Sequence, residues 1–188
     1  MAVRVGVIAE EGNDVEVLYE FSCKLVPENS FRFKKFVGHG CGTLRRKCRS
    51  WARNLVESGC THLVVLHDLD ARDEEALRND LEAAIGDLPF SAHVILIPIQ
   101  EIEAWLLCDA MALRRVFHMN KTPRVPQHPE SISSPKEYPR NLVWKSCRKR
   151  YLHTIHNKRV AREADIDRLE ACPSFALYPS FIQAAVNP

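Results

Sequence analysis

Three short apolar runs, separated by segments of helical periodicity, constrain the fold of this chain more than any other feature. The runs lie at 3–8, 62–67 and 92–99, and 62–67 reads His-Leu-Val-Val-Leu-His. A strand that is continuously apolar is typical of a parallel sheet, because helices cover both of its faces. With a fourth strand at 31–37, the pattern predicts an α/β fold: a Rossmann-like, mainly parallel four-stranded sheet between helices.

The segments between these strands have the spacing of amphipathic helices. Asn13 and Glu16 form an N-cap and capping-box pair, which predicts a helix from about Asp14. Thr43 is predicted to cap a second helix, with an apolar stripe facing inward and a basic outer face. Further helices are predicted at 73–85 and 101–107.

Charge divides the chain into two parts. Residues 1–110 carry 12 Lys/Arg and 18 Asp/Glu, a net charge of −6, whereas residues 111–188 carry 14 and 6, a net charge of +8. We interpret 1–110 as the core and 111–188 as a helical C-terminal extension packed on it, in one structural unit. Within the extension, 121–140 is proline-containing and irregular, 142–170 is helical in pieces, and the aromatic segment 172–182 docks on the core.

The cysteines and the absence of long apolar segments indicate a cytoplasmic protein without a membrane span. None of the seven cysteines forms a Cys-x-x-Cys pair, and the amino terminus has no signal-peptide core. The spacing of Cys147, His153 and His156 matches no common zinc finger.

Carboxylates follow three of the four predicted strands. In a parallel sheet the carboxyl ends of the strands meet at one edge, where ligands bind. Like charges gathered there repel one another unless a cation is bound, and oxygen ligands suit Mg²⁺ or Mn²⁺. An alternative is that the aspartates cap the next helix and the last two glutamates begin a solvated face. The residues concerned are Glu10, Glu11, Asp68, Asp70, Glu101 and Glu103.

A strand that ends in Glu, followed later by a strand that ends in Asp-x-Asp, resembles the Toprim domain of topoisomerases, primases and overcoming-lysogenization-defect nucleases. More narrowly, five segments resemble an uncharacterised Toprim-like family whose members often sit beside ATPases in bacterial defence loci. The segments are 9–18, 66–70, 100–109, 128–132 and 172–175.

The resemblance implies catalytic and metal-binding roles for Glu10, Asp68 and Asp70, with Glu103 completing the metal site. Further candidates are Glu11, Asp14, Glu101 and His67. His67 directly precedes Asp68, and we expect a core or rim histidine there rather than a general base. The family motif reads Glu-Gly-x-Ser/Thr-Asp, and aligning Asp14 with its last residue makes Glu10 the motif glutamate but places Glu11 where glycine is expected. Aligning Glu11 and Gly12 instead moves Asp14 one place too early. We favour Glu10.

The expected function is a Mg²⁺-dependent (or Mn²⁺-dependent) nuclease of Toprim type, acting in bacterial defence against phage. The alternative is a non-catalytic module that binds an AAA/ABC-type ATPase or nucleic acid; a homo-oligomer is compatible with both. Tyr151 is a candidate for stacking on bases, whereas Trp144 is expected to pack in the core. Nucleic-acid contacts are expected from Arg45, Arg46, Lys47, Arg49, Arg148, Lys149, Arg150, Lys158 and Arg159.

Overall fold

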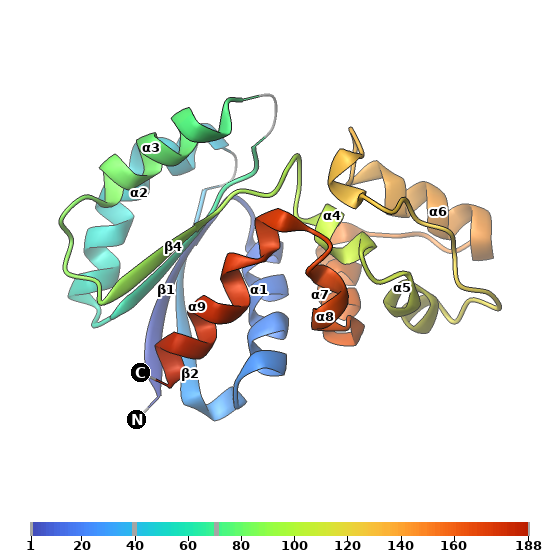
Figure 1. The fold of residues 1–188 in the computed structure, drawn as a ribbon, viewed down its shortest axis with the longest axis horizontal. Helices are drawn as coiled ribbons and strands as arrows, with labels where there is room; N and C mark the ends of the chain where they lie inside the picture. The colour runs from blue at the N-terminus through green and yellow to red at the C-terminus, as the bar shows by residue number, and fades with distance from the viewer. Residues whose placement is uncertain (1, 39–40, 70–71, 188) are drawn as a thin grey trace.

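A parallel sheet forms the centre of the protein. The structure is a computed structural model that describes residues 2–38, 41–69 and 72–187. Its four strands are all parallel and lie in the order β2-β1-β3-β4 (Figure 1). The predicted α/β fold with a four-stranded parallel sheet is therefore confirmed. The strands are β1 (Val3–Ala9), β2 (Phe31–Val37), β3 (His62–Leu66) and β4 (Ala92–Leu96).

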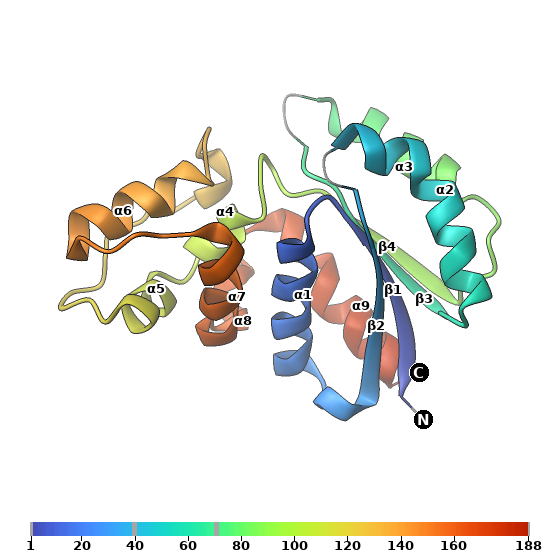
Figure 2. The same ribbon diagram turned by 180° about the vertical axis from the view of Figure 1, so that it is seen from behind.

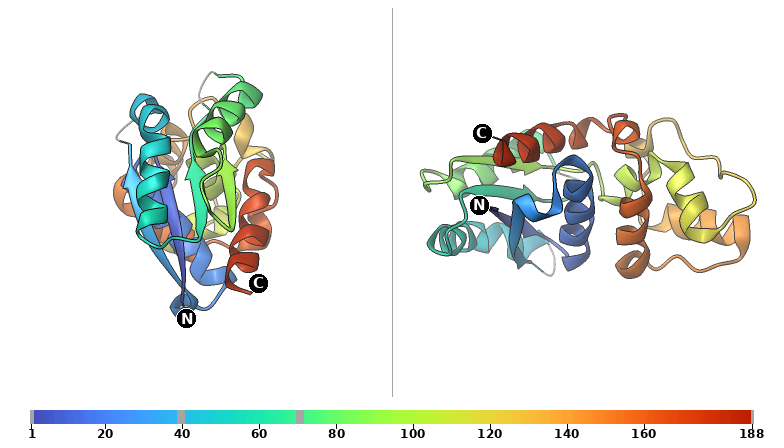
Figure 3. Two further views of the ribbon diagram at one scale, coloured as in Figure 1. Left: turned by 90° about the vertical axis from the view of Figure 1, so that its left-hand side faces the viewer. Right: turned by 90° about the horizontal axis from the view of Figure 1, so that it is seen from below.

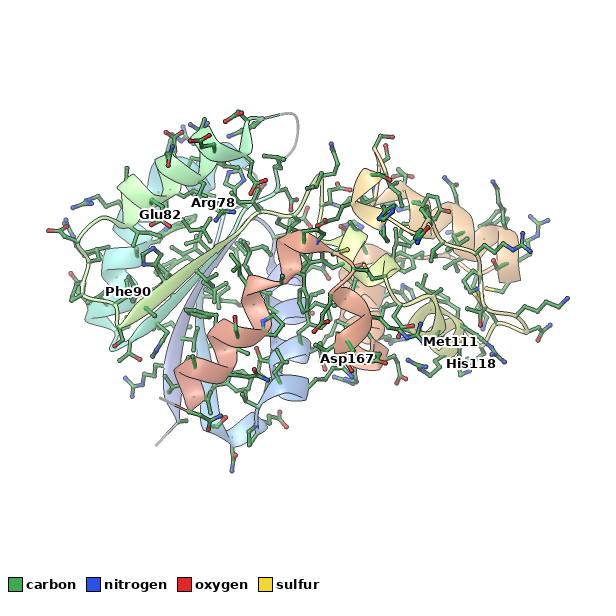
Figure 4. All side chains as sticks on the ribbon, viewed as in Figure 1. Arg78, Glu82, Phe90, Met111, His118 and Asp167 are labelled. Carbon is green, nitrogen blue, oxygen red and sulfur yellow. The ribbon has the colours of Figure 1, made fainter. Side chains whose placement is uncertain are left out.

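Helices cover both faces of this sheet. Along β3, Leu63 and Val65 pack into the apolar cluster under α2 (Cys41–Glu57) and α3 (Glu74–Ile85). Val64 and Leu66 pack into the opposite cluster, under α1 (Gly12–Leu25) and α9 (Leu177–Val186). The continuous apolar run of β3 thus reflects burial on both sides. Figure 4 shows Arg78 on α3, where its guanidinium donates to the Ile95 carbonyl at 3.0 Å and ties the helix to β4.

Two helices begin earlier than their capping residues predict. The N-cap of α1 is Glu11 rather than Asn13, because the Asp14 carboxylate accepts the Glu11 backbone N–H at 2.9 Å. Helix α2 already includes Thr43, so Thr43 is not its cap. The Asp73 side chain caps α3 by accepting the Ala76 N–H at 2.8 Å.

The extension forms a lobe of short helices beside α1. Figures 1 and 2 show this lobe at the opposite end of the molecule from α2 and α3. The segment 121–140 was predicted to be irregular, and 121–136 contains only one short 3-10 turn, but a helix already begins at Glu137. The α-helix at 110–117 was not predicted. The extension forms the lobe from α5 (Ala110–Phe117), η2 (Pro129–Ser131), α6 (Glu137–Cys147), α7 (His153–Glu163) and α8 (Ile166–Leu169). Helix α4 (Glu103–Leu107), which precedes the extension, leads from β4 into the lobe.

The end of the chain returns to the sheet through η3 (Pro173–Phe175) and α9 (Figure 3). Phe175, Tyr178 and Ile182 are fully buried, which confirms that the aromatic segment docks on the core. The Tyr178 hydroxyl donates to the Leu18 carbonyl on α1 at 2.9 Å. None of the helices within the described residues has the length and apolarity needed to cross a bilayer.

Candidate functional site

Glu10 and Asp68 meet at the carboxyl ends of β1 and β3. The two strands are neighbours, so the residues that follow them lie side by side. The Asp68 backbone N–H donates to Glu10 Oε1 at 3.1 Å, and only 12% of the Glu10 side chain is exposed. The structure therefore brings together two of the three residues predicted to be catalytic. Asp70, the third, lies outside the described residues.

His67 holds the Glu10 carboxylate in place. Its ring is fully buried, and Nδ1 lies 3.0 Å from Glu10 Oε1 and 2.7 Å from the Asp68 carbonyl oxygen. Because a carbonyl oxygen only accepts hydrogen bonds, Nδ1 carries the hydrogen. Nε2 is buried without a hydrogen-bond partner. His67 therefore positions Glu10 and has no access to solvent.

Asp14 adds a third carboxylate from the first turn of α1. Burial is the main cause that raises the pKa of Asp14 to about 8. The charges of Glu103 and Glu11 act in the same direction, whereas the hydrogen bond from the Glu11 N–H and the charge of Lys136 oppose it. A carboxyl with this pKa is largely protonated at neutral pH unless a cation compensates its charge. Asp14 is thus part of the acidic cluster and not only a helix-capping residue.

The pKa of Asp68 shows how closely the carboxylates gather. Burial raises it well above the usual range, and the charges of Asp14, Glu10, Glu103 and Glu101 each add to the effect. Because charge repulsion of this kind falls off with distance, these side chains share one neighbourhood. We call Glu10, Asp14, Asp68, Glu101 and Glu103 the acidic cluster.

A strained turn between β4 and α4 carries two members of the acidic cluster. Gln100 has a φ of 72°, in the left-handed region that non-glycine residues rarely adopt. Such strain is common at functional sites, where the surrounding structure maintains it. The turn is followed by Glu101, whose Oε2 accepts the Lys136 backbone N–H at 2.7 Å, and by Glu103.

Glu103 is held by a hydrogen-bond network from α7. It is 2% exposed, and its Oε1 accepts from Asn157 Nδ2 at 2.9 Å. Asn157 in turn accepts from the Tyr151 hydroxyl at 2.7 Å. Tyr151 is only 3% exposed, so the expectation that it stacks on bases is wrong. Its ring packs in the core and its hydroxyl supports the Glu103 network.

Lys136, from the segment before α6, places a cation against the acidic cluster. Its ammonium donates to Glu11 Oε1 at 3.0 Å and lies 3.9 Å from Glu101 Oε1. Burial lowers the pKa of Lys136, but the hydrogen bond with Glu11 and the charges of Glu103, Glu11 and Glu101 outweigh this and raise it overall. The side chain therefore stays charged. No signal in the sequence around Lys136 indicates this position.

Glu10 and Glu11 have different surroundings. Glu10 contacts Asp68 and His67, whereas Glu11 is the N-cap of α1 and pairs with Lys136. Glu10, the glutamate favoured from the sequence, is thus the one that contacts Asp68 at the end of β3.

The donor set suits a hard divalent cation. Clustered carboxylates repel one another, and Asn13, in the same helical turn as Asp14, has a buried Oδ1 without a hydrogen-bond partner. Oxygen atoms of these kinds are the ligands of Mg²⁺ and Mn²⁺. Within 2–38, 41–69 and 72–187, however, no three His, Cys, Asp or Glu side chains form a ready-made metal-binding group. The acidic cluster therefore fits a cation in chemistry, and a complete ligand set requires a residue or movement beyond it.

The basic residues expected to bind nucleic acid lie at both ends of the molecule. On α2, Arg45 pairs with Asp80 at 2.5 Å and Arg49 with Asp87 at 3.6 Å, while Lys47 lies over the Trp51 ring. The ion pairs with Asp80 on α3 and with Asp87 just beyond that helix partly neutralise the basic face of α2. The side chains of Arg46, Arg150 and Arg159 are exposed, Lys149 donates to the Phe117 carbonyl at 2.7 Å, and Lys158 is half-buried.

Trp144 is not a core residue, contrary to expectation. It is 49% exposed on α6, and the Arg148 guanidinium lies over its ring at 5.6 Å. The helix turns only Pro139 and Val143 fully into the core, which leaves Trp144 on the outer face.

A known protein family covers most of the chain. The family model described as Domain of unknown function (DUF4276) matches residues 18–179. The chain belongs to this family. The DUF4276 match includes Asp68, Glu103, Lys136 and Asn157 and begins beyond Glu10. No curated protein and no solved structure matches the chain. Membership in a family of unknown function is thus confirmed, and the relation of DUF4276 to Toprim domains stays a prediction.

Proposed function

We propose that the protein is a Mg²⁺-dependent or Mn²⁺-dependent nuclease of Toprim type, which hydrolyses phosphodiester bonds in DNA or RNA as an effector of bacterial defence against phage. The observation that carries this proposal is the acidic cluster. Carboxylates that follow β1 and β3, one from α1 and two around the start of α4 lie near one another. Burial raises the pKa of Asp68 well above its usual range, and the charges of the other four carboxylates raise it further. The Toprim resemblance of the same segments supports it.

In this proposal Glu10, Asp68, Asp70 and Glu103 hold the metal. A bound divalent ion supplies an activated water and offsets the charge that develops on the phosphate. His67 keeps the Glu10 carboxylate turned toward Asp68, and Asn157 fixes one oxygen of Glu103. The Lys136 ammonium adds positive charge beside the acidic cluster, where it favours an anionic phosphate group.

Cleavage assays with the full chain test this function. Labelled single- and double-stranded DNA and RNA are incubated with Mg²⁺, Mn²⁺ or EDTA. We expect metal-dependent cleavage that Asp68→Asn and Glu10→Gln reduce by about 100-fold or more, because each removes a charged metal ligand. Asp87→Asn is the matched control, since that carboxylate is 94% exposed just beyond the end of α3. Cleavage that persists undiminished in EDTA contradicts the proposal.

The second candidate is a non-catalytic module that binds an ATPase partner or nucleic acid. Lys136 favours this second candidate, because its ammonium already pairs with Glu11 and lies close to Glu101. A magnesium titration followed by thermal unfolding separates the two candidates. At a tenfold excess over Kd, bound metal stabilises the folded state by about 1.4 kcal/mol, or a few degrees in Tm. A module without a metal site shows no such shift and no turnover.

A further inference from the structure

A groove runs along α1 on the edge of the molecule that β2 forms. Its volume is about 830 Å³. Side chains from α1, from η1 (Glu28–Ser30), from β2 and from α7 line it. Strand β2 is an edge strand of the sheet, paired only with β1 among the described strands. Of the residues named individually above as nucleic-acid contacts, Lys158 lines this groove.

Two aromatic rings form part of the groove wall. Tyr19 and Phe33 are both half-buried, with ring centroids 6.0 Å apart and planes at 80°. The Tyr19 hydroxyl donates to Glu28 at 2.8 Å, and this hydrogen bond raises the pKa of Tyr19 to about 12, so the hydroxyl stays protonated at neutral pH. Partly exposed aromatic rings are the surfaces on which unpaired bases stack.

Three cations surround these rings. The Arg32 guanidinium is oriented by the Phe31 carbonyl at 2.9 Å, whereas Lys35 and Lys158 take part in no ion pair with any described residue. Glu16 and Glu28 also line the groove. A lining that mixes three cations with two carboxylates suits a strand whose phosphates are spread out. It does not suit a compact polyphosphate, whose charges need clustered cations.

The groove adjoins the acidic cluster at two points. Its α1 residues Val15 and Glu16 directly follow Asp14 in the same helix. On α7, Lys158 directly follows Asn157, which holds Glu103. On both helices the groove lining is therefore one residue along the chain from a side chain that belongs to the acidic cluster or supports it.

We propose that this groove binds single-stranded DNA or RNA and leads the strand to the acidic cluster. The first part of this proposal, binding of a single strand, is argued from the groove alone. The second part, delivery of the strand for cleavage, rests on the proposed nuclease function. Stacking on Tyr19 and Phe33 requires unpaired bases, so the groove selects single strands over duplexes.

Fluorescence anisotropy in EDTA tests the binding without cleavage. The probes are a labelled 12-nucleotide single strand and the duplex of the same sequence. The full chain is used as wild type, as Lys35→Glu/Lys158→Glu and as the control Lys121→Glu/Arg124→Glu. Both control residues are exposed cations outside the groove. We expect the groove variant to bind the single strand at least tenfold more weakly, with a salt slope smaller by about 1.4 for two lost phosphate contacts. The control stays within about threefold of wild type, and circular dichroism verifies the fold of both variants.

Equal binding by wild type and the groove variant overturns the proposal, and so does equal affinity for single strand and duplex, or no binding of the single strand by wild type. Cleavage assays in Mg²⁺ distinguish a failure of the groove proposal from a failure of the proposed nuclease function. Loss of binding in the groove variant without any cleavage by wild type supports the groove and contradicts the nuclease. Cleavage of single strands by the groove variant at the wild-type rate contradicts the groove and supports the nuclease.

Discussion

Asp14 shows how burial sets the charge state of a single residue in this protein. Its pKa is raised from 3.8 to about 8, mainly by burial. Between these two values the folded state binds a proton that the unfolded state has released. The free energy of unfolding therefore falls as the pH rises from about 4 to about 8, and is constant with respect to this group beyond those limits.

The variant Asp14→Asn tests this at the residue scale. Its amide oxygen still accepts the Glu11 N–H, but it has no charge to bury. In EDTA, we expect the variant to be more stable than wild type at pH 8 by roughly 2 to 4 kcal/mol, with little difference at pH 4. Urea unfolding at both pH values measures this. Asp87→Asn is the control because its carboxylate is exposed, and a pH dependence of Asp14→Asn equal to that of wild type would contradict the assigned pKa.

At the scale of elements, three of the segments that resemble the Toprim-like family contact one another. They are 100–109, 128–132 and 172–175. The Trp105 indole N–H, from α4, donates to Oγ of Ser174 in η3 at 2.7 Å. Ser174 Oγ donates in turn to Glu130 in η2. Trp105 is fully buried and packs edge-on against Phe175. These segments therefore join α4, η2 and η3 in one structural unit, and none of these three contacts belongs to the acidic cluster itself.

Removing the hydroxyl from this junction has a predictable effect. Ser174→Ala leaves the buried Trp105 N–H without a partner, which costs about 1–3 kcal/mol of the free energy of unfolding. Ser180→Ala, on the exposed side of α9, is expected to change it by less than about 0.5 kcal/mol. Denaturant unfolding of both variants measures the difference. Equal stability of Ser174→Ala and Ser180→Ala would show that the junction does not hold these elements together.

At the scale of the whole molecule, the extension and the sheet share one core. Val5 and Val7 of β1 belong to the same cluster of buried residues as Val143, Tyr151 and Val160 from α6, its following segment and α7. The α1–α7 interface is closed by a bidentate ion pair between Glu20 and Arg162, with distances of 3.0 and 2.7 Å. Neither part covers its apolar surface alone.

We therefore expect the chain to unfold in a single cooperative transition, although its charge differs between 1–110 and 111–188. Urea transitions followed by far-ultraviolet circular dichroism and by tryptophan fluorescence should coincide. A fragment comprising 1–110 is expected to lack a cooperative transition, since it exposes the apolar surface of Trp105 and its neighbours. Two separate transitions in the full chain would contradict the shared core.

The parallel sheet and the pairing of Glu10 with Asp68 were predictable from the sequence. Both depend on short-range patterns, since an apolar run forms a buried strand and the residue after a strand lies at the edge of the sheet. The start of α1 was predicted two residues too late. The Asp14 side chain, in the first turn of the helix, accepts the backbone N–H of the N-cap residue Glu11, so the helix begins at Gly12.

Lys136 and Asn157 were not predictable, because each reaches the acidic cluster from a segment far along the chain. Lys136 lies 125 residues from Glu11, and Asn157 lies 54 residues from Glu103. The same holds for the groove, where η1, β2 and α7 meet along α1. The sequence alone determined the layers of the sheet and the edge at which the carboxylates gather, because local apolar periodicity sets both. Only the tertiary structure decided which cations face those carboxylates and which surface adjoins them, because packing of the extension against α1 brings these distant residues together.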